Sequence, residues 1–163
     1  MMNTVFRCGM LLALALVLLA GFGCAKKPAV DLDVAEEMVM TESERLAAQR
    51  ISDGVIYFAY DRYDLSSEAR TILTQKAAVM KEVPQLRVTI EGHCDERGTE
   101  EYNLALGERR ARAAFDFLVT IGVNPNQMEM VSFGKLRPAV LANNEAAWAQ
   151  NRRDEFRVYK PRQ

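Results

Sequence analysis

The densest group of reactive side chains lies in the segment from Glu91 to Arg112, which reads EGHCDERGTEEYNLALGERRAR. It contains Glu91, Asp95, Glu96, Glu100, Glu101 and Glu108 with Arg97, Arg109, Arg110 and Arg112, beside His93, Cys94 and Asn103. A carboxylate on a loop and a guanidinium on the following helix suit a zwitterionic ligand. Asp95 would then bind an ammonium group and Arg110 a carboxylate. Two other interpretations stay open at this point: Asp95 and Arg110 pair with each other, or the charges form a solvated face.

Helical spacing places part of this group on one stripe. Asn103, Gly107 and Arg110 follow an i, i+4, i+7 pattern, about 100° from an apolar stripe that begins at Leu104. A glycine in the middle of a helix costs roughly 1 kcal/mol of helix propensity. We therefore expect another group to pack against the stripe at Gly107.

His93 and Cys94 raise the alternative of a thiol or metal enzyme. Neighbours on a strand point to opposite faces, and catalytic Cys and His residues are normally brought together by the fold rather than by adjacency. The chain has one histidine, so a zinc site would need His93, Cys94 and distant carboxylates. We expect no enzyme activity, no cofactor and no metal, with His93 a hydrogen-bonded structural residue at the strand end and Trp148 a packing residue.

The elements that position these groups follow from periodicity. Strands are predicted over residues 55–60, 86–91, 128–133 and 155–159, and helices over 66–83, 100–121 and 144–150. Ser66 is the predicted N-cap of the first of these helices, and Gly122 ends the second. The order β-α-β-α-β-(α)-β predicts an α+β domain over residues 53–163, a mixed four-stranded sheet with helices on one face.

The chain before this domain reads as an export signal and a tether. Residues 1–23 contain an uncharged run from Gly9 to Gly23 after Arg7, and small residues lead to Cys24. This pattern is similar to a bacterial lipobox and predicts lipidation of Cys24, so that only Cys94 stays a free thiol. An ordinary signal or an uncleaved anchor is the alternative. Residues 25–52 predict a flexible tether, and an extension packed on the domain is the alternative.

The net charge of the chain argues against nucleic acid as a partner. The 163 residues carry 21 Lys and Arg against 22 Asp and Glu, a formal charge of −1. Residues 53–163 carry 16 of each sign. This balance gives no attraction for nucleic acid and suits a zwitterionic ligand.

Four motifs together resemble one known family. They are GHCDERGTEEYNLALGERRA, the earlier YFAYDRYDLS, the later VSFGKLRPAV and the closing NRRDEFRVY. They resemble OmpA-like peptidoglycan-binding domains, in the branch whose members are anchored by lipid, over residues 53–160. Gly107 departs from the usual Ser, Cys94 from a frequent Ala, and Ala59 and Tyr60 from the usual Asp and Phe.

The resemblance implies non-covalent binding of the diaminopimelate residue in the peptidoglycan stem peptide. In that family, the residue at the position of Asp95 binds the ligand's ammonium, and the one at the position of Arg110 binds a carboxylate. Asp61 and its neighbouring backbone would line the groove, and Asn103 and Arg97 would orient these groups. Arg152 and Arg153 match a further family segment, for which a structural salt bridge is weighed at least equally.

The resemblance also implies partners and a location. The expected protein is palmitate-bearing and attached to the outer membrane through Cys24, and Ala25 resembles the signal for transport to that membrane. Its domain would face the periplasm, bind peptidoglycan and contact TolB and other Tol-system proteins in envelope integrity and cell division. The alternative is an envelope protein-interaction module that does not bind the cell wall.

Overall fold

The computed structural model describes residues 40–161. Along the chain its elements are α1 (Glu42–Ser52), β1 (Ile56–Tyr57), α2 (Ser67–Glu82), β2 (Arg87–His93), α3 (Glu100–Thr120), a 3-10 turn (Pro125–Gln127), β3 (Met128–Gly134), α4 (Glu145–Asn151) and β4 (Arg153–Tyr159). The predicted elements are all present. They differ from the predicted ranges at their ends, most clearly at β1.

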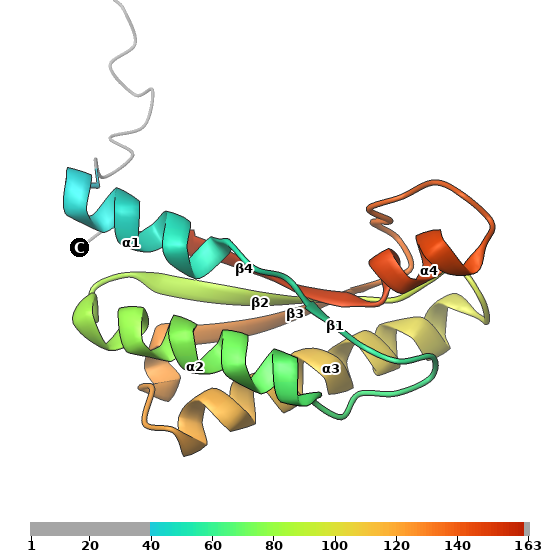
Figure 1. Cartoon of the computed structure of the whole chain (residues 1–163), viewed down its shortest axis with the longest axis horizontal. Helices are drawn as coiled ribbons and strands as arrows, with labels where there is room; N and C mark the ends of the chain where they lie inside the picture. Colours follow the sequence, from blue (N-terminus) through green and yellow to red (C-terminus); the bar gives the residue numbers. More distant parts are fainter. Residues whose placement is uncertain (1–39, 162–163) are drawn as a thin grey trace, which may run out of the picture. The chain divides into compact units, whose positions relative to one another are not determined.

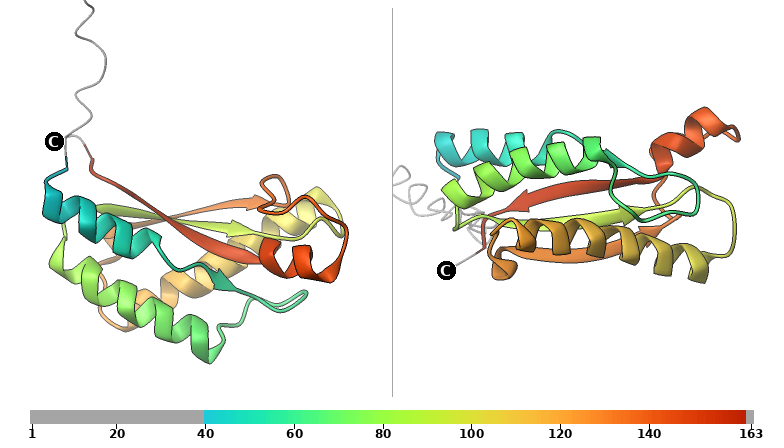
Figure 2. Two further views of the ribbon diagram at one scale, coloured as in Figure 1. Left: turned by 45° about the horizontal axis from the view of Figure 1, so that its top comes forward. Right: turned by 60° about the horizontal axis from the view of Figure 1, so that its bottom comes forward.

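The four strands form one mixed sheet in the order β1-β4-β2-β3. β2 and β3 are parallel, joined through α3, while β4 lies antiparallel to both β1 and β2. Figure 1 shows α2 and α3 along one side of the strands, and Figure 2 shows α4 at the end of the sheet away from α1. The mixed four-stranded α+β sheet expected from the sequence is confirmed.

The two faces of the sheet carry different side chains. On one face, Val88 and Ile90 of β2 lie opposite Val158 and Phe156 of β4 and form a core with the helices, as their alternation predicts. Buried residues from α1, α2 and α3 complete this core, among them Ile51, Leu73, Met80, Ala111, Ala114 and Leu118. The opposite face, which we call the outer face, carries the intervening residues of β2, including Glu91 and His93.

β1 is shorter than predicted because its backbone turns to other partners. Only Ile56 and Tyr57 pair with β4. The Phe58 carbonyl accepts a hydrogen bond from Nε of Arg152 at 3.0 Å, and the Ala59 carbonyl accepts one from Arg110 at 3.3 Å. The Phe58 N–H still donates to the Arg152 carbonyl at 2.9 Å, so one backbone bond continues beyond the paired residues. The arginine contacts begin directly after the two residues that pair with β4.

α1 corrects the expected tether. Thr41 and Glu44 form a capping box at its start, and Ile51 near its end is fully buried. The Lys160 ammonium pairs with Glu44 at 2.9 Å, and the Lys76 ammonium donates to the carbonyls of Ile51 and Asp53. Residues 42–52 are thus folded against the domain, which is the alternative considered above.

The predicted signal segment, Cys24 and the tether up to residue 39 lie outside the described residues. Within residues 40–161, no helix has both the length and the apolar character needed to span a membrane.

We predict that Ile51→Ala lowers the free energy of unfolding by about 2–5 kcal/mol, because it removes a fully buried side chain and leaves a cavity. Leu46→Ala on the same helix is the matched control, since Leu46 is 53% exposed, and it should change the value by less than about 1 kcal/mol. Chemical denaturation of the full chain measures both. Equal, negligible effects would mean that α1 is a tether after all.

Candidate functional site

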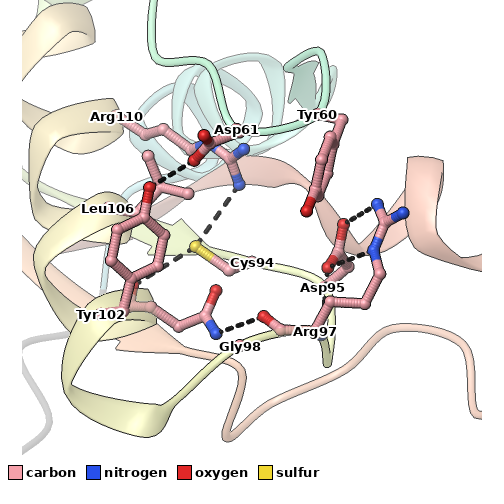
Figure 3. Close-up of a pocket in the computed structure, with 10 residues that line it drawn as sticks. Tyr60, Asp61, Cys94, Asp95, Arg97, Gly98, Tyr102, Leu106 and Arg110 are labelled. Carbon is pink, nitrogen blue, oxygen red and sulfur yellow. Dashed lines mark hydrogen bonds and ion pairs between the residues drawn. The ribbon is translucent and has the colours of Figure 1, made fainter.

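The five residues proposed from the sequence line a single pocket. Asp61, Asp95, Arg97, Asn103 and Arg110 surround a cavity of about 170 Å³ at the end of the sheet near α4. Tyr60, Cys94, Gly98, Tyr102 and Leu106 complete its lining. Figure 3 shows the labelled residues converging from the loop after β1, the loop after β2 and the first half of α3. The fold therefore brings together residues that are up to 49 positions apart in the sequence (110 − 61 = 49).

Arg110 lies at the base of the pocket and is fully buried. Its Nη1 donates to the His93 carbonyl at 2.7 Å, and its Nε donates to the Arg62 carbonyl at 2.9 Å. A longer bond of 3.3 Å runs from Nη2 to the Ala59 carbonyl. Burial lowers the pKa of Arg110 from its usual value. A guanidinium remains charged even so, because its unperturbed pKa is above 12.

Arg110 has no ion pair with a carboxylate among residues 40–161. Asp154 is also fully buried, and its oxygens have no hydrogen-bond partner. Burial raises the pKa of Asp154 well above its usual range, which favours the neutral acid. Because no carboxylate oxygen lies within ion-pair distance of Arg110 among residues 40–161, the interpretation that Arg110 pairs directly with Asp95 is wrong.

Asp95 is paired instead with two other arginines. Its Oδ1 accepts from the backbone N and Nε of Arg97 at 3.2 and 3.1 Å, and its Oδ2 accepts from Nη2 of Arg97 at 2.7 Å and Nη1 of Arg152 at 3.2 Å. Burial raises the pKa of this carboxyl, but the bonds from Arg97 and Arg152 outweigh it and hold the pKa below its usual value. These four bonds use all the acceptor sites of a carboxylate.

Arg97 is held between two aromatic rings. Its guanidinium carbon lies 3.9 Å from the centre of the Tyr60 ring and 4.2 Å from that of Trp148. The Trp148 indole also donates to Glu96 at 3.0 Å. Trp148 is thus a packing residue, as expected, and the group it packs on belongs to the pocket.

Arg152 makes the structural salt bridge that the sequence left open. Its side chain is buried, pairs with Glu145 of α4 at 2.6 Å and reaches Asp95 at 3.2 Å. Arg153 pairs with Glu155 at 2.6 Å and lies outside the pocket lining. Both arginines therefore support the fold around the site rather than line it.

Asn103 fixes the loop that closes one side of the pocket. Its amide nitrogen donates to the carbonyls of Arg97 at 2.8 Å and Thr99 at 2.9 Å. From the other side, the Lys135 ammonium donates to the Gly98 carbonyl at 2.7 Å. This supports the orienting role expected for Asn103.

Asp61 is the acid with the fewest partners in the pocket. It is exposed, and its carboxylate accepts a hydrogen bond from the Tyr102 hydroxyl. Its φ of 55° lies in the left-handed region, the one such non-glycine residue among residues 40–161. Such a conformation costs of order 1–3 kcal/mol and occurs often at binding sites. Tyr102 was not predicted as a site residue, although it lines the pocket. An aromatic residue among the acids of the first turn of α3 was the signal in the sequence that could have identified it.

The stripe of Asn103, Gly107 and Arg110 is buried against the sheet. The expected apolar stripe is confirmed at Ala111, Ala114 and Leu118, which lie in the core, but not at Leu104. Leu104 is half-buried, while the three stripe residues are buried. A Cβ at Gly107 would lie 2.4 Å from the Ser132 hydroxyl and 2.9 Å from the Gly92 carbonyl. The group that packs against Gly107 is thus the sheet, and this close approach sets the depth at which Arg110 enters.

Cys94 and His93 point to different sides of β2, as strand geometry predicts. The Cys94 thiol lines the pocket, donates to the Asn103 carbonyl at 3.3 Å and has its pKa raised to about 11 by burial. His93 stacks on Phe133, with 5.5 Å between ring centres. A protonated thiol is a poor nucleophile, so the arrangement does not support a Cys–His catalytic pair.

Comparison with known proteins bears on this geometry. A family model described as the OmpA family matches residues 57–152. The chain belongs to the OmpA family. Within it, the chain groups with the peptidoglycan-associated lipoproteins, as the sequence motifs indicated. It is 47% identical over 138 residues to the peptidoglycan-associated lipoprotein of Pseudomonas aeruginosa, covering 85% of this chain and 75% of the relative.

Other relatives agree. The peptidoglycan-associated lipoprotein of Brucella melitensis is 40% identical over 148 residues, covering 87% of this chain and 88% of the relative. The crystal structure of that of Burkholderia pseudomallei is 43% identical, with a TM-score of 0.65 over 67% of this chain and 92% of its own. The C-terminal domain of Helicobacter pylori MotB, 19% identical, has a TM-score of 0.62 over 66% of this chain and 85% of its own, which shows the shared fold alone.

We predict that Asp95→Asn destabilises the domain by roughly 3 kcal/mol at pH 7, because buried Arg152 loses a charged partner. The pKa of Asp95 is depressed in the folded state. Its contribution is therefore present above the usual value of 3.8 and is lost as the pH falls through the lower folded value.

Denaturant titrations of the wild type and Asp95→Asn at several pH values measure this difference. It should narrow as the pH falls below 3.8. Asp64→Asn is the control, since the Arg62–Asp64 pair is exposed, and it should have no measurable effect. A difference between wild type and Asp95→Asn that does not change with pH would contradict the assignment.

Proposed function

We propose that this pocket binds the diaminopimelate residue of the peptidoglycan stem peptide without covalent chemistry. The observation that carries the proposal is the buried guanidinium of Arg110, which has no ion pair among residues 40–161, in a pocket that Asp95 and the exposed Asp61 also line. The name of the relatives, peptidoglycan-associated lipoprotein, agrees with this ligand. A cation and two acids around one pocket suit a side chain that ends in an ammonium and a carboxylate.

The ligand's carboxylate is assigned to Arg110. Nη2 of this residue makes a single hydrogen bond in the described structure, to the Ala59 carbonyl at 3.3 Å. An Nη2 group has two N–H donors, so one is left for a ligand. A charge-assisted bond from a buried guanidinium is among the stronger polar contacts a protein can offer.

The ligand's ammonium is assigned to Asp95 and Asp61 together. Asp61 carries one hydrogen bond, from Tyr102, and is open to solvent. Asp95 would accept the ammonium in exchange for one of its bonds from Arg97, whose side chain is 29% exposed. Asn103 and Arg97 then act as positioning residues for the loop and for Asp95.

We further propose the cellular setting. The protein would be an outer-membrane lipoprotein attached through acylated Cys24, with its domain in the periplasm, and would tether the outer membrane to the cell wall. It would work with TolB and other Tol proteins in a Tol-Pal system that maintains the envelope and serves division. It would act as a binding protein rather than an enzyme, so incubation with sacculi should release no soluble peptidoglycan fragments.

We predict that Asp61→Asn and Asp95→Asn each reduce co-sedimentation with diaminopimelate-type sacculi at least tenfold, because each removes an acceptor for the ammonium. Asp64→Asn, close in sequence but outside the pocket lining, should bind like the wild type. Thermal melts of each variant identify any that fails to fold.

The ligand offers a second control. Sacculi with lysine in place of diaminopimelate lack the carboxylate assigned to Arg110, so the wild type should bind them more weakly. Arg110→Lys keeps the charge but loses the Nη2 donor assigned to the ligand's carboxylate, so the difference in binding between the two kinds of sacculi should become smaller. Unchanged binding in both aspartate variants, or equal binding to both sacculi, would refute the assignment.

We predict that mass spectrometry of the mature protein shows an N-terminal acylated Cys24, and that Cys24→Ser leaves the protein in the soluble periplasmic fraction. One acyl chain gives marginal membrane attachment and several give firm attachment. An intact Met1 or an unmodified Cys24 in the mature wild type would contradict this.

A further inference from the structure

The outer face of the sheet carries a second cluster of polar groups, separate from the pocket. Glu91 and His93 come from β2, and Glu155 comes from β4, where it lies directly opposite Glu91. One ligand-type atom from each residue lies within 4.8 Å of the other two. None of the three lines the proposed peptidoglycan pocket.

The imidazole of His93 is the unexplained group in this cluster. It is 1% exposed, and neither of its nitrogens has a hydrogen-bond partner, so the expectation of a hydrogen-bonded histidine is wrong. Buried polar atoms are almost always paired, since leaving one unpaired costs about 1–3 kcal/mol. Phe133 covers one face of the ring, so the nitrogens at the ring edge remain for a partner in the ring plane. Glu91 is equally enclosed, with 5% of its surface exposed.

We propose that Glu91, His93 and Glu155 bind a zinc-class divalent cation on the outer face. Imidazole nitrogen and carboxylate oxygen are both zinc ligands, and sites with three protein ligands hold a water molecule in the fourth position. The ligand atoms must close by about 1 Å, since zinc holds N and O ligands at about 2.0–2.2 Å. Rotation of the two glutamate side chains supplies that movement.

The neighbouring arginines leave room for the ion. Nε of Arg157 binds one oxygen of Glu91 at 2.8 Å, and Nε of Arg153 binds one oxygen of Glu155 at 2.6 Å. Each carboxylate therefore keeps a second oxygen for a metal, while the arginine orients the group as outer-shell partners do. The Arg157 side chain is 66% exposed, so water screens its charge, whereas the Arg153 side chain is 7% exposed and its charge is balanced by its pair with Glu155.

Solvent reaches the cluster from one side. Ser52, Val55 and Arg157 border a hollow that also touches Glu91 and Glu155. This hollow opens onto the two carboxylates and gives a bound ion its water ligand. A bound cation would cross-link β2 to β4 and give one of the two unpaired nitrogens of His93 a partner.

The test uses the full chain in detergent, freed of metal with a chelator, and Zn²⁺ alone as the probe. Equilibrium dialysis should show one saturable site, and Zn²⁺ should raise the melting temperature. Glu155→Gln, at a partly exposed position, and His93→Asn should each weaken binding at least tenfold. Glu108→Gln, on the exposed side of α3, is the matched control and should bind like the wild type.

The melting curve before zinc is added identifies any variant that does not fold, and Glu155→Gln keeps the test decisive if His93→Asn unfolds. Sacculus binding by Glu155→Gln should stay at the wild-type level, which separates this site from the pocket. No saturable Zn²⁺ binding by the wild type would overturn the proposal. Equal zinc affinity in wild type and Glu155→Gln would also overturn it, because the ion would then bind elsewhere.

Discussion

The arrangement of the pocket depends on one buried guanidinium. Arg110 enters between α3 and the sheet and donates to backbone carbonyls at the end of β2 and in the loop after β1. Burying a cation is costly unless hydrogen bonds replace its water. Three carbonyls supply those bonds without cancelling the charge, so the same residue holds two segments together and leaves the pocket positive at its base. Gly107 makes this possible, because a Cβ there would collide with Ser132 and push α3 outward.

The two acids of the site differ in how many hydrogen bonds they accept. Asp95 is clamped by Arg97 and Arg152, and Arg97 is itself stacked between Tyr60 and Trp148. Such a network orders the loop after β2 before any ligand arrives, which reduces the entropy lost on binding. Asp61 is outside this network and open to solvent. A pocket built this way combines a preorganised wall with one acid that can meet a ligand directly.

β2 serves two regions of the molecule at once. Its end carries Cys94 and Asp95 into the pocket, while Glu91 and His93 face the outer side of the sheet. The His93 carbonyl also accepts a bond from Arg110, so the outer cluster and the pocket share one stretch of backbone. A cation that tied Glu155 to this strand would brace the segment from which the pocket is built.

The sequence by itself determined the elements and the candidate residues. Alternation and β-branched runs gave the strands, and Ser66 was correctly predicted as an N-cap. The charged motif supplied four of the residues that line the pocket, Asp95, Arg97, Asn103 and Arg110, and the family resemblance added Asp61. Periodicity and helix capping depend on residues close together in the chain, so each helix or strand can be predicted from its own short segment of sequence. The packing of α1 was left open, because its buried side depends on Glu44 meeting Lys160, 116 positions away.

Only the tertiary structure decided which charges meet. Asp95 pairs with Arg152, 57 positions away, because the antiparallel register of β4 brings that arginine back to the end of β2. The same register sets Glu155 opposite Glu91 and beside His93, where the sequence had suggested only distant carboxylates. Side-chain type limits what a residue can bind, but the packing of segments far apart in the chain determines its partner.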